Sequence, residues 1–216
     1  MVDEKTVMQL RLPRNQVRSF EEVVTTIANY RKDCPAVIDL FDRTIDGPHD
    51  DITPVDVLSL HALEAFGGRV HPMTPLTSLW LERDNITDSV CPVTKRDIDE
   101  ITDEEVDSEV PKVAHALRVI DGIKGFGSTS SAKLLHRLRP NVGAIWDSHV
   151  QQWYERKKPR RPSWVDWLRT VYSQVRQDDN RRCLLAVRES LDVCLPLLRI
   201  WDIVLWQSKP PQRALV

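Results

Sequence analysis

Two helical patterns joined by a short glycine-containing turn constrain the fold of this chain most strongly. Apolar residues recur at helical spacing after Pro111, and Gly122 is placed to end that helix. A second helical pattern runs from Ser128 to Leu138, and little more than the residues IKGFG lies between the two. The segment therefore predicts a helix, a glycine hairpin and a second helix.

Helical periodicity also dominates the remainder of the 216-residue chain, and few segments alternate as strands do. We expect further helices over residues 17–31, 53–66, 148–156, 180–194 and 196–207, and one that starts at residue 163. Residues 35–41 fit a short strand or a helical turn, residues 71–92 a loop or short helix, and the acidic residues 97–109 a solvated helix face or a mobile loop. With 41% hydrophobic residues, the chain can bury a sizeable core.

The charge of the chain is distributed unevenly. A net charge of -2 argues against a protein that coats nucleic acid non-specifically. Residues 97–109 hold eight acids and no base, whereas residues 121–169 hold ten Lys or Arg against four acids. One part of the chain is therefore suited to face phosphates while another repels them.

The cysteines and the start of the chain bear on its compartment. Cys34, Cys91, Cys183 and Cys194 show no paired or cluster spacing, which is typical of a reduced protein with buried thiols. The first residues, MVDEKTVMQLRLPRN, lack an apolar signal core, and no uncharged apolar run approaches the length of a membrane span. We expect a cytoplasmic protein without a membrane partner, a metal or a cofactor.

The glycine turn predicts an anion site. Glycine tolerates positive φ and leaves room for a ligand to approach the backbone, and amides at a helix start attract phosphate. The residues expected to contact phosphate are Lys124, Gly125, Gly127, Ser128, Thr129, Ser130 and Lys133. The alternative is that the glycines only make a tight turn between helices and that the serines cap the second helix.

Two short motifs and their spacing carry a resemblance to a known family. The residues IKGFG fit a hydrophobic residue, a variable residue and then G-hydrophobic-G, and the residues IWDSHV fit a hydrophobic-D-[ST]-H-V segment. Gly125 and Asp147 are 22 residues apart, which is the usual interval. In these features the chain resembles the helix-hairpin-helix superfamily of DNA glycosylases. It also resembles an uncharacterised bacterial family with helix-hairpin-helix character.

The resemblance implies a fold, a partner and a catalytic residue. It implies one all-α domain over residues 1–216, with the hairpin at 110–138 and the active-site segment at 144–154. The hairpin would grip double-stranded DNA, and the target base would be flipped into a cleft that contains Asp147. The carboxylate would stabilise positive charge on the sugar and direct the attacking water. Asp147 also fits the N-cap of the helix that follows, and the two roles are compatible.

The sequence departs from the family at one position that matters for chemistry. Where bifunctional members carry the lysine that attacks the sugar, this chain has Thr129, and Lys133 lies one helical turn further on. The resemblance therefore implies a monofunctional glycosylase. His149 and Trp146 are candidate pocket residues, although each fits a packed position as well. The basic residues 156–161 fit a solvated loop or a DNA contact.

Two classes of function follow from these patterns. The leading interpretation is a monofunctional DNA glycosylase that hydrolyses the N-glycosidic bond of a damaged or modified base. The alternative is a non-catalytic helix-hairpin-helix module that binds DNA or a protein partner, and a third interpretation is a purely structural helical protein. A carboxylate of Asp147 in an open polar cleft shared with the hairpin favours the enzyme. The sequence leaves the substrate base and the oligomeric state open.

Overall fold

Helices make up most of the structure, a computed structural model that describes residues 8–37, 41–42, 47–62, 73–154, 163–191 and 194–208. The all-α class is confirmed. One small antiparallel sheet, which the sequence did not predict, pairs β1 (Gln9–Leu12) with β2 (Gln16–Ser19). Within the described residues, no helix is both long and apolar enough to pass through a membrane.

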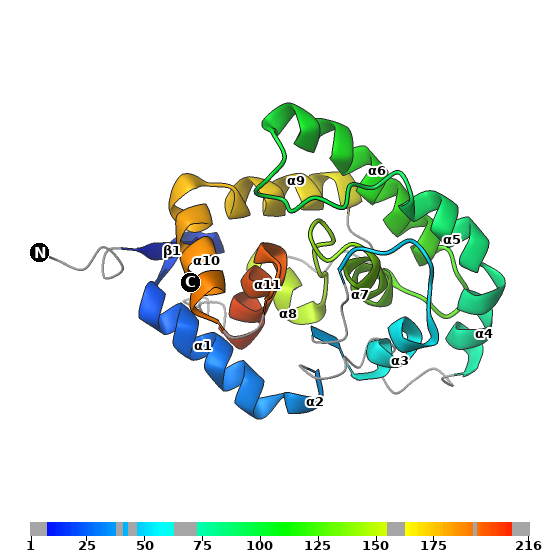
Figure 1. Cartoon of the computed structure of the whole chain (residues 1–216), viewed down its shortest axis with the longest axis horizontal. Helices are drawn as coiled ribbons and strands as arrows, with labels where there is room; N and C mark the ends of the chain where they lie inside the picture. Colours follow the sequence, from blue (N-terminus) through cyan, green and yellow to red (C-terminus); the bar gives the residue numbers. More distant parts are fainter. Residues whose placement is uncertain are drawn as a thin grey trace, which may run out of the picture.

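Two buried helices occupy the middle of the molecule, α7 (Ser128–Leu138) and α11 (Leu197–Gln207) (Figure 1). All residues from 197 to 205 of α11 are buried, as expected for a helix that is apolar on nearly every face. In α7, residues 130–138 are likewise buried. The helices around them include α1 (Phe20–Asp33), α6 (Asp103–Asp121), α9 (Trp164–Val175) and α10 (Asp178–Ser190).

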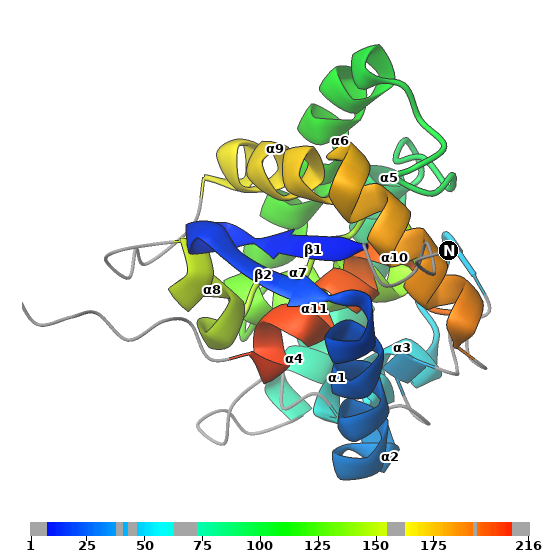
Figure 2. The ribbon, with the colours of Figure 1, turned by 90° about the vertical axis from the view of Figure 1, so that its left-hand side faces the viewer.

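The small sheet near the start of the described chain lies beside α10 and above α1 (Figure 2). The backbone N–H of Arg11 donates to Oδ1 of Asn180 over 2.6 Å, and Nδ2 of Asn180 donates to the carbonyl of Arg11 over 3.0 Å. The helix expected from residue 17 begins at Phe20 instead, because Ser19 forms a capping box with Glu22. Val17 belongs to β2.

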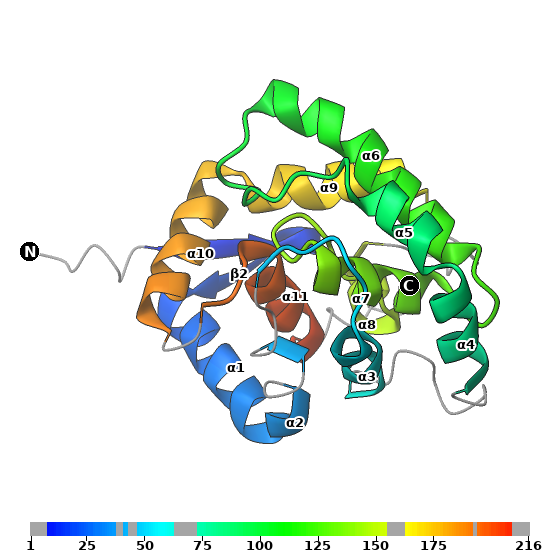
Figure 3. The same cartoon turned by 45° about the vertical axis from the view of Figure 1, so that its right-hand side comes forward.

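Further helices, all short, lie between α1 and α6 in the chain. They are α2 (Pro35–Val37), α3 (Pro54–Ala62), α4 (Met73–Leu81) and α5 (Arg83–Val90). Of these, α3, α4 and α5 follow one side of the molecule (Figure 3). The prediction of a loop or one short helix over residues 71–92 was wrong, because Pro75 lies in the first turn of α4, where its missing N–H breaks no bond. The expected end of α3 at Gly67 and Gly68 lies outside the described residues.

The first helix of the hairpin is longer than predicted. α6 begins at Asp103, where Thr102 and Glu105 form a capping box, and Pro111 lies inside the helix rather than at its start. Part of the acidic stretch 97–109 therefore forms the first turns of α6, in which acidic side chains favour the positive end of the helix dipole. The second helix, α7, has the predicted bounds.

The elements after the hairpin follow the predicted order, but the helix expected over residues 180–194 spans Asp178–Ser190 instead, because the backbone of Leu191 is extended. α8 (Ser148–Tyr154) starts directly after Asp147, and Ser163 precedes α9. The expected basic loop at residues 156–161 lies outside the described residues. α6 and α9 lie side by side in both Figure 1 and Figure 3, and α11 packs against α8.

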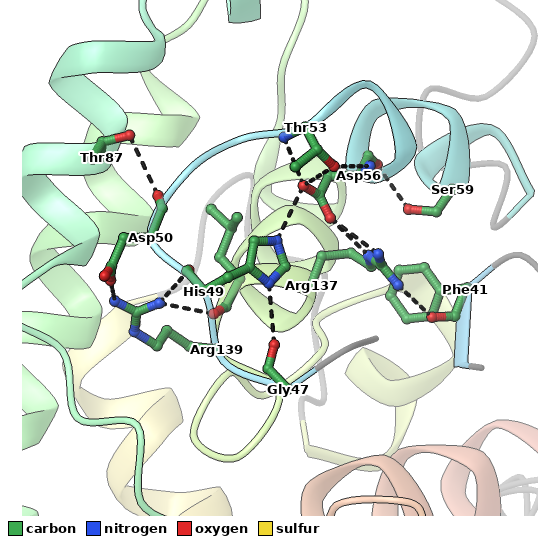
Figure 4. A network of polar contacts seen from close by, with 11 residues as sticks. Phe41, Gly47, His49, Asp50, Thr53, Asp56, Ser59, Thr87, Arg137 and Arg139 are labelled. Atoms are coloured by element: carbon green, nitrogen blue, oxygen red, sulfur yellow. Dashed lines mark hydrogen bonds and ion pairs between the residues drawn. The ribbon is translucent and has the colours of Figure 1, made fainter. Parts of the chain in front are cut away.

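Two buried arginines fix the carboxyl end of α7 (Figure 4). Nε and Nη2 of Arg137 donate to Oδ1 of Asp56 over 3.1 and 3.0 Å, and Nη1 donates to the carbonyl of Phe41 over 2.7 Å. Nε of Arg139 donates to the carbonyl of Val93 over 3.1 Å, and Nη2 pairs with Asp50. These bonds hold the helix along its axis and so set the position of its amino end.

Candidate active site

A cavity of about 410 Å³ opens between α1, α7, α11 and the start of α8. Its volume lies in the range of small-molecule sites. The predicted site residues that line it are Thr129, Lys133, Asp147 and His149. Further lining comes from residues that the sequence did not single out, chiefly Tyr30, Arg199, Asp202 and Trp206.

Asp147 is held in a fixed orientation at the edge of this cavity. Its Oδ1 accepts the backbone N–H groups of His149 and Val150, each over 2.9 Å, and its side chain is about nine-tenths buried. The predicted cap is thus confirmed, and the same carboxylate lines the cavity. A capping carboxylate in a cavity can orient a water molecule and stabilise a neighbouring positive charge.

The hairpin helix contributes two side chains to the same cavity. Thr129 lies in the first turn of α7, and Lys133 follows one turn later on the same face. Lys133 is almost fully buried, with 7% of its surface exposed. Its positive charge acts on Asp202, because it lowers the pKa of that carboxyl group. Residues 144–154 and the hairpin therefore contribute side chains to one cavity.

An arginine from α11 organises the buried part of the site. Nε of Arg199 donates to Oδ1 of Asp42 over 2.7 Å, and Nη2 donates to Oδ2 of Asp42 over 3.2 Å and to the hydroxyl of Tyr30 over 2.6 Å. Nη1 donates to Oδ2 of Asp202. This network joins α1 and α11 and leaves Arg199 committed to partners within the protein.

Asp202 is a second carboxyl group beside Asp147. Burial and the charge of Asp147 raise the pKa of Asp202 to about 7, although Arg199 and Lys133 act to lower it. The two acids therefore differ in environment, since Asp147 is fixed by backbone amides and Asp202 is buried against the arginine network. Two carboxyl groups in such different environments can take different roles in one site, because one is more readily protonated than the other.

Aromatic side chains form the rim of the cavity. The ring centroid of His149 lies 5.5 Å from that of Trp206, and Tyr30 meets the same indole edge-on at 6.1 Å. His149 is exposed, and Trp206 keeps 38% of its surface accessible. The rim therefore presents flat apolar surfaces to an occupant of the cavity.

The two glycines of the turn have different roles. Gly125 adopts φ +91, and a Cβ there would lie 3.2 to 3.3 Å from Pro75, so this position requires glycine. Gly127 was expected to need the same freedom, but its backbone is extended, with φ -142, and a Cβ would meet nothing within 4 Å. Its open surroundings instead allow a large ligand to approach the backbone.

The hydroxyl of Ser130 serves the turn itself. The N–H of Gly127 donates to Oγ of Ser130 over 2.9 Å, and the same hydroxyl donates back to the carbonyl of Gly127 over 2.9 Å. Ser130 is buried, so it does not offer a surface donor to phosphate as the sequence suggested. Ser128 and Thr129 remain partly exposed at the start of α7, where the first backbone amides have no partner within the helix.

Two other predicted residues lie outside the cavity lining. Trp146 is buried and packs edge-on against Trp164 and Trp167, with ring centroids 6.4 and 4.6 Å away, so it is a core residue rather than a pocket residue. Lys124 is exposed on the turn and lines a separate shallow groove with Leu81. The hairpin therefore has a basic outer side and a buried inner side.

One sequence signal pointed to the residues that the prediction missed. Helix α11 reads LLRIWDIVLWQ, in which Arg199 and Asp202 are the charged residues of an otherwise apolar segment. Charged side chains are rarely buried unless they are paired, and paired buried charges often mark functional sites. The contribution of Tyr30 had no such signal, because it depends on packing between α1 and α11.

The described residues contain no cluster of three or more His, Cys, Asp or Glu side chains suited to hold a metal ion.

No curated protein and no solved structure matches the chain significantly. A family model does match it over residues 23–209, and its description is Family of unknown function (DUF6308). The match covers most of the 216 residues and includes the hairpin, Asp147 and α11. The chain therefore belongs to the DUF6308 family.

Proposed function

We propose that this protein is a monofunctional DNA glycosylase that binds duplex DNA through its hairpin and hydrolyses the N-glycosidic bond of an extruded, modified base. One observation carries the proposal. Asp147 and two side chains of the hairpin helix, Thr129 and Lys133, line the same polar cavity. A module that only bound DNA through its turn would use Asp147 as a cap but would not need that carboxylate in a cavity shared with the hairpin.

The turn and the start of α7 suit a DNA backbone. The amino end of a helix attracts phosphate through its backbone amides, and Lys124 adds an exposed positive charge close by. The extended backbone and open surroundings of Gly127 admit a bulky ligand. This contact is independent of base sequence, as is usual for proteins that search along DNA.

The cavity suits the base and the reaction. The glycosidic carbon is shielded inside stacked DNA, so the nucleotide must leave the helix before it reacts. A cavity of about 410 Å³ next to the hairpin can receive the base. Asp147, fixed by two backbone amides, then stabilises the positive charge that develops on the sugar and orients the water that replaces the base.

A panel of duplexes tests this function and its monofunctional character. Each duplex carries one modified base, and excision is scored as strand cleavage after alkali treatment. We expect one or more duplexes to give cleavage only after alkali, because Thr129 offers no amine to form the imine that strand cleavage by elimination requires. Borohydride trapping should therefore give no covalent adduct between protein and DNA.

Lys133 supplies the decisive control for this prediction, because its amine also lines the cavity. An adduct that disappears in Lys133→Ala would contradict monofunctional chemistry and would make this lysine the nucleophile. A panel without any excised base would contradict the glycosylase itself. Retained DNA binding in that case would support the non-catalytic module, which the capping role of Asp147 also favours.

Replacement of Gly127 by valine is expected to weaken duplex binding about tenfold, the loss of roughly one charge-assisted hydrogen bond. The extended backbone accepts valine and nothing lies within 4 Å of the added Cβ, so helical content should be unchanged. Fluorescence anisotropy at several salt concentrations measures the affinity, and Gly127→Ala should give a smaller loss. An unchanged affinity and salt dependence in the valine variant would exclude the turn as the DNA contact.

A further inference from the structure

One wall of the cavity comes from a single face of α11. Asp202 and Trp206 are four residues apart, which places them on the same side of the helix, and both line the cavity. Asp202 is 5% exposed and lies within the wall, whereas Trp206 is 38% exposed and lies at the rim. The helix thus presents a carboxylate and an indole to the same occupant.

The carboxylate of Asp202 has unused hydrogen-bonding capacity. Its Oδ2 accepts from Arg199, but its buried Oδ1 has no hydrogen-bond partner among the residues that the structure describes. A buried acceptor without a partner is unfavourable, and such atoms in native proteins call for an explanation. Arg199 already donates to Asp42 and Tyr30, so a donor carried by an occupant of the cavity is a fitting partner for Asp202.

Trp206 is suited to stack on a flat ligand. Large aromatic side chains with an accessible surface at a cavity mouth are the usual platforms for unstacked bases. Its contacts with Tyr30 and His149 are edge-on and tilted, with ring centroids 6.1 and 5.5 Å apart, so neither ring covers the indole face to face. A base in the cavity can therefore place its ring against Trp206 and its polar edge towards Asp202.

On the basis of the glycosylase function proposed above, we propose that α11 selects the base: Asp202 accepts hydrogen bonds from the N1–H and 2-amino groups of a guanine-type edge, while Trp206 stacks on the ring. The pKa of Asp202 lies at about 7, so the ionised form prevails above neutral pH, and an ionised carboxylate only accepts hydrogen bonds. Guanine presents two neighbouring donors to it. Adenine and cytosine present an amino group beside a ring-nitrogen acceptor, and uracil presents one N–H between two carbonyl oxygens. Each of these edges would place an acceptor atom against an oxygen of the carboxylate, which is unfavourable. The modified base keeps both donors of guanine.

Titration of the whole protein with two free nucleosides at about pH 8, where Asp202 is mostly ionised, tests this selection. Deoxyguanosine and deoxyinosine differ only in the 2-amino group, so their affinities isolate one donor. We expect deoxyguanosine to bind about tenfold more tightly, the size of one hydrogen bond to a charged group. Equal affinities, a preference for deoxyinosine, or no binding of either nucleoside at its solubility limit would overturn the proposal.

Variants separate the two roles of α11. Asp202→Asn keeps the side-chain shape, and Arg199 retains Asp42 as a partner, so the fold should persist while the preference for deoxyguanosine falls below about threefold. Trp206→Ala should lower the affinity for both nucleosides by about tenfold and leave the ratio of the two affinities unchanged. Trp80→Ala is the matched control, since Trp80 is also exposed but does not line the cavity, and it should change neither affinity.

These titrations require no excision, so the two proposals can fail separately. If the protein discriminates between the nucleosides but excises no base, the guanine-binding site is supported and the glycosylase activity is contradicted. If the protein excises a base but does not discriminate between the two nucleosides, the glycosylase activity is supported and the role of Asp202 is contradicted. Unchanged binding in Trp206→Ala would remove the stacking role, whatever the outcome for excision.

Discussion

Asp147→Asn is expected to lower base excision at least about a hundredfold while the protein folds and binds DNA nearly as before. Asn caps a helix about as well as Asp, so the bonds from the amides of His149 and Val150 should persist. The substitution removes the negative charge that stabilises the sugar cation, and losses of this size follow when a preorganised electrostatic group is removed. Single-turnover excision, measured with thermal unfolding on the same preparation, gives both quantities.

Asp147→Ala separates the two roles of the residue. It removes the cap as well as the charge, so unfolding should become easier by about 1 kcal/mol, while excision should fall as far as in the Asn variant. If Asp147 acts only as a cap, the Asn variant is nearly silent in both measurements. Full excision by a well-folded Asn variant would rule out the mechanism proposed here and leave the binding module as the better description.

Arg137→Met is expected to lower the free energy of unfolding by about 3 to 5 kcal/mol, the usual cost of removing one partner from a buried ion pair. Asp56 keeps bonds from His49 and Thr53 but loses both bonds from the guanidinium, and the carbonyl of Phe41 loses its donor (Figure 4). Partners in the wild-type protein hold the pKa of Asp56 at about 2, so its charge persists after the substitution at neutral pH. Urea unfolding followed by circular dichroism measures the difference.

A surface pair provides the control for this prediction. Arg182 and Asp179 form an ion pair of 2.8 Å, but their side chains are 71% and 46% exposed. Arg182→Met should therefore cost less than about 1 kcal/mol. Equal effects of the two substitutions would show that the buried network around Arg137 does not hold the end of α7.

Features that depend on local sequence could be predicted. The bounds of α7 follow from the turn glycines before it and from an apolar pattern that ends at Leu138, and the cap at Asp147 follows from one polar residue before a helical pattern. The conformation of Gly127 was not predictable in this way, because a glycine can provide space instead of positive φ. Pro75 favoured a loop over residues 71–92 but lies in the first turn of a helix, and Pro111 was expected to open a helix but lies inside one.

Features that depend on distant packing could not be predicted. Tyr30 and Arg199 are 169 positions apart, and their hydrogen bond exists only because α1 packs against α11. Periodicity within α11 indicates a buried helix but not which cavity its charged residues border. The placement of Asp202 beside Asp147 in one cavity therefore emerged only from the three-dimensional arrangement.

The packing of α1 against α11 also determines when the cavity can form during synthesis. Tyr30 leaves the ribosome long before Arg199, and at the usual rates of translation the delay is on the order of 10 s. During this interval α1, whose apolar side chains are buried in the finished protein, lacks its partner α11. The nascent chain must therefore stay unaggregated, with chaperone help or by transient contacts of its own, until α11 has been made.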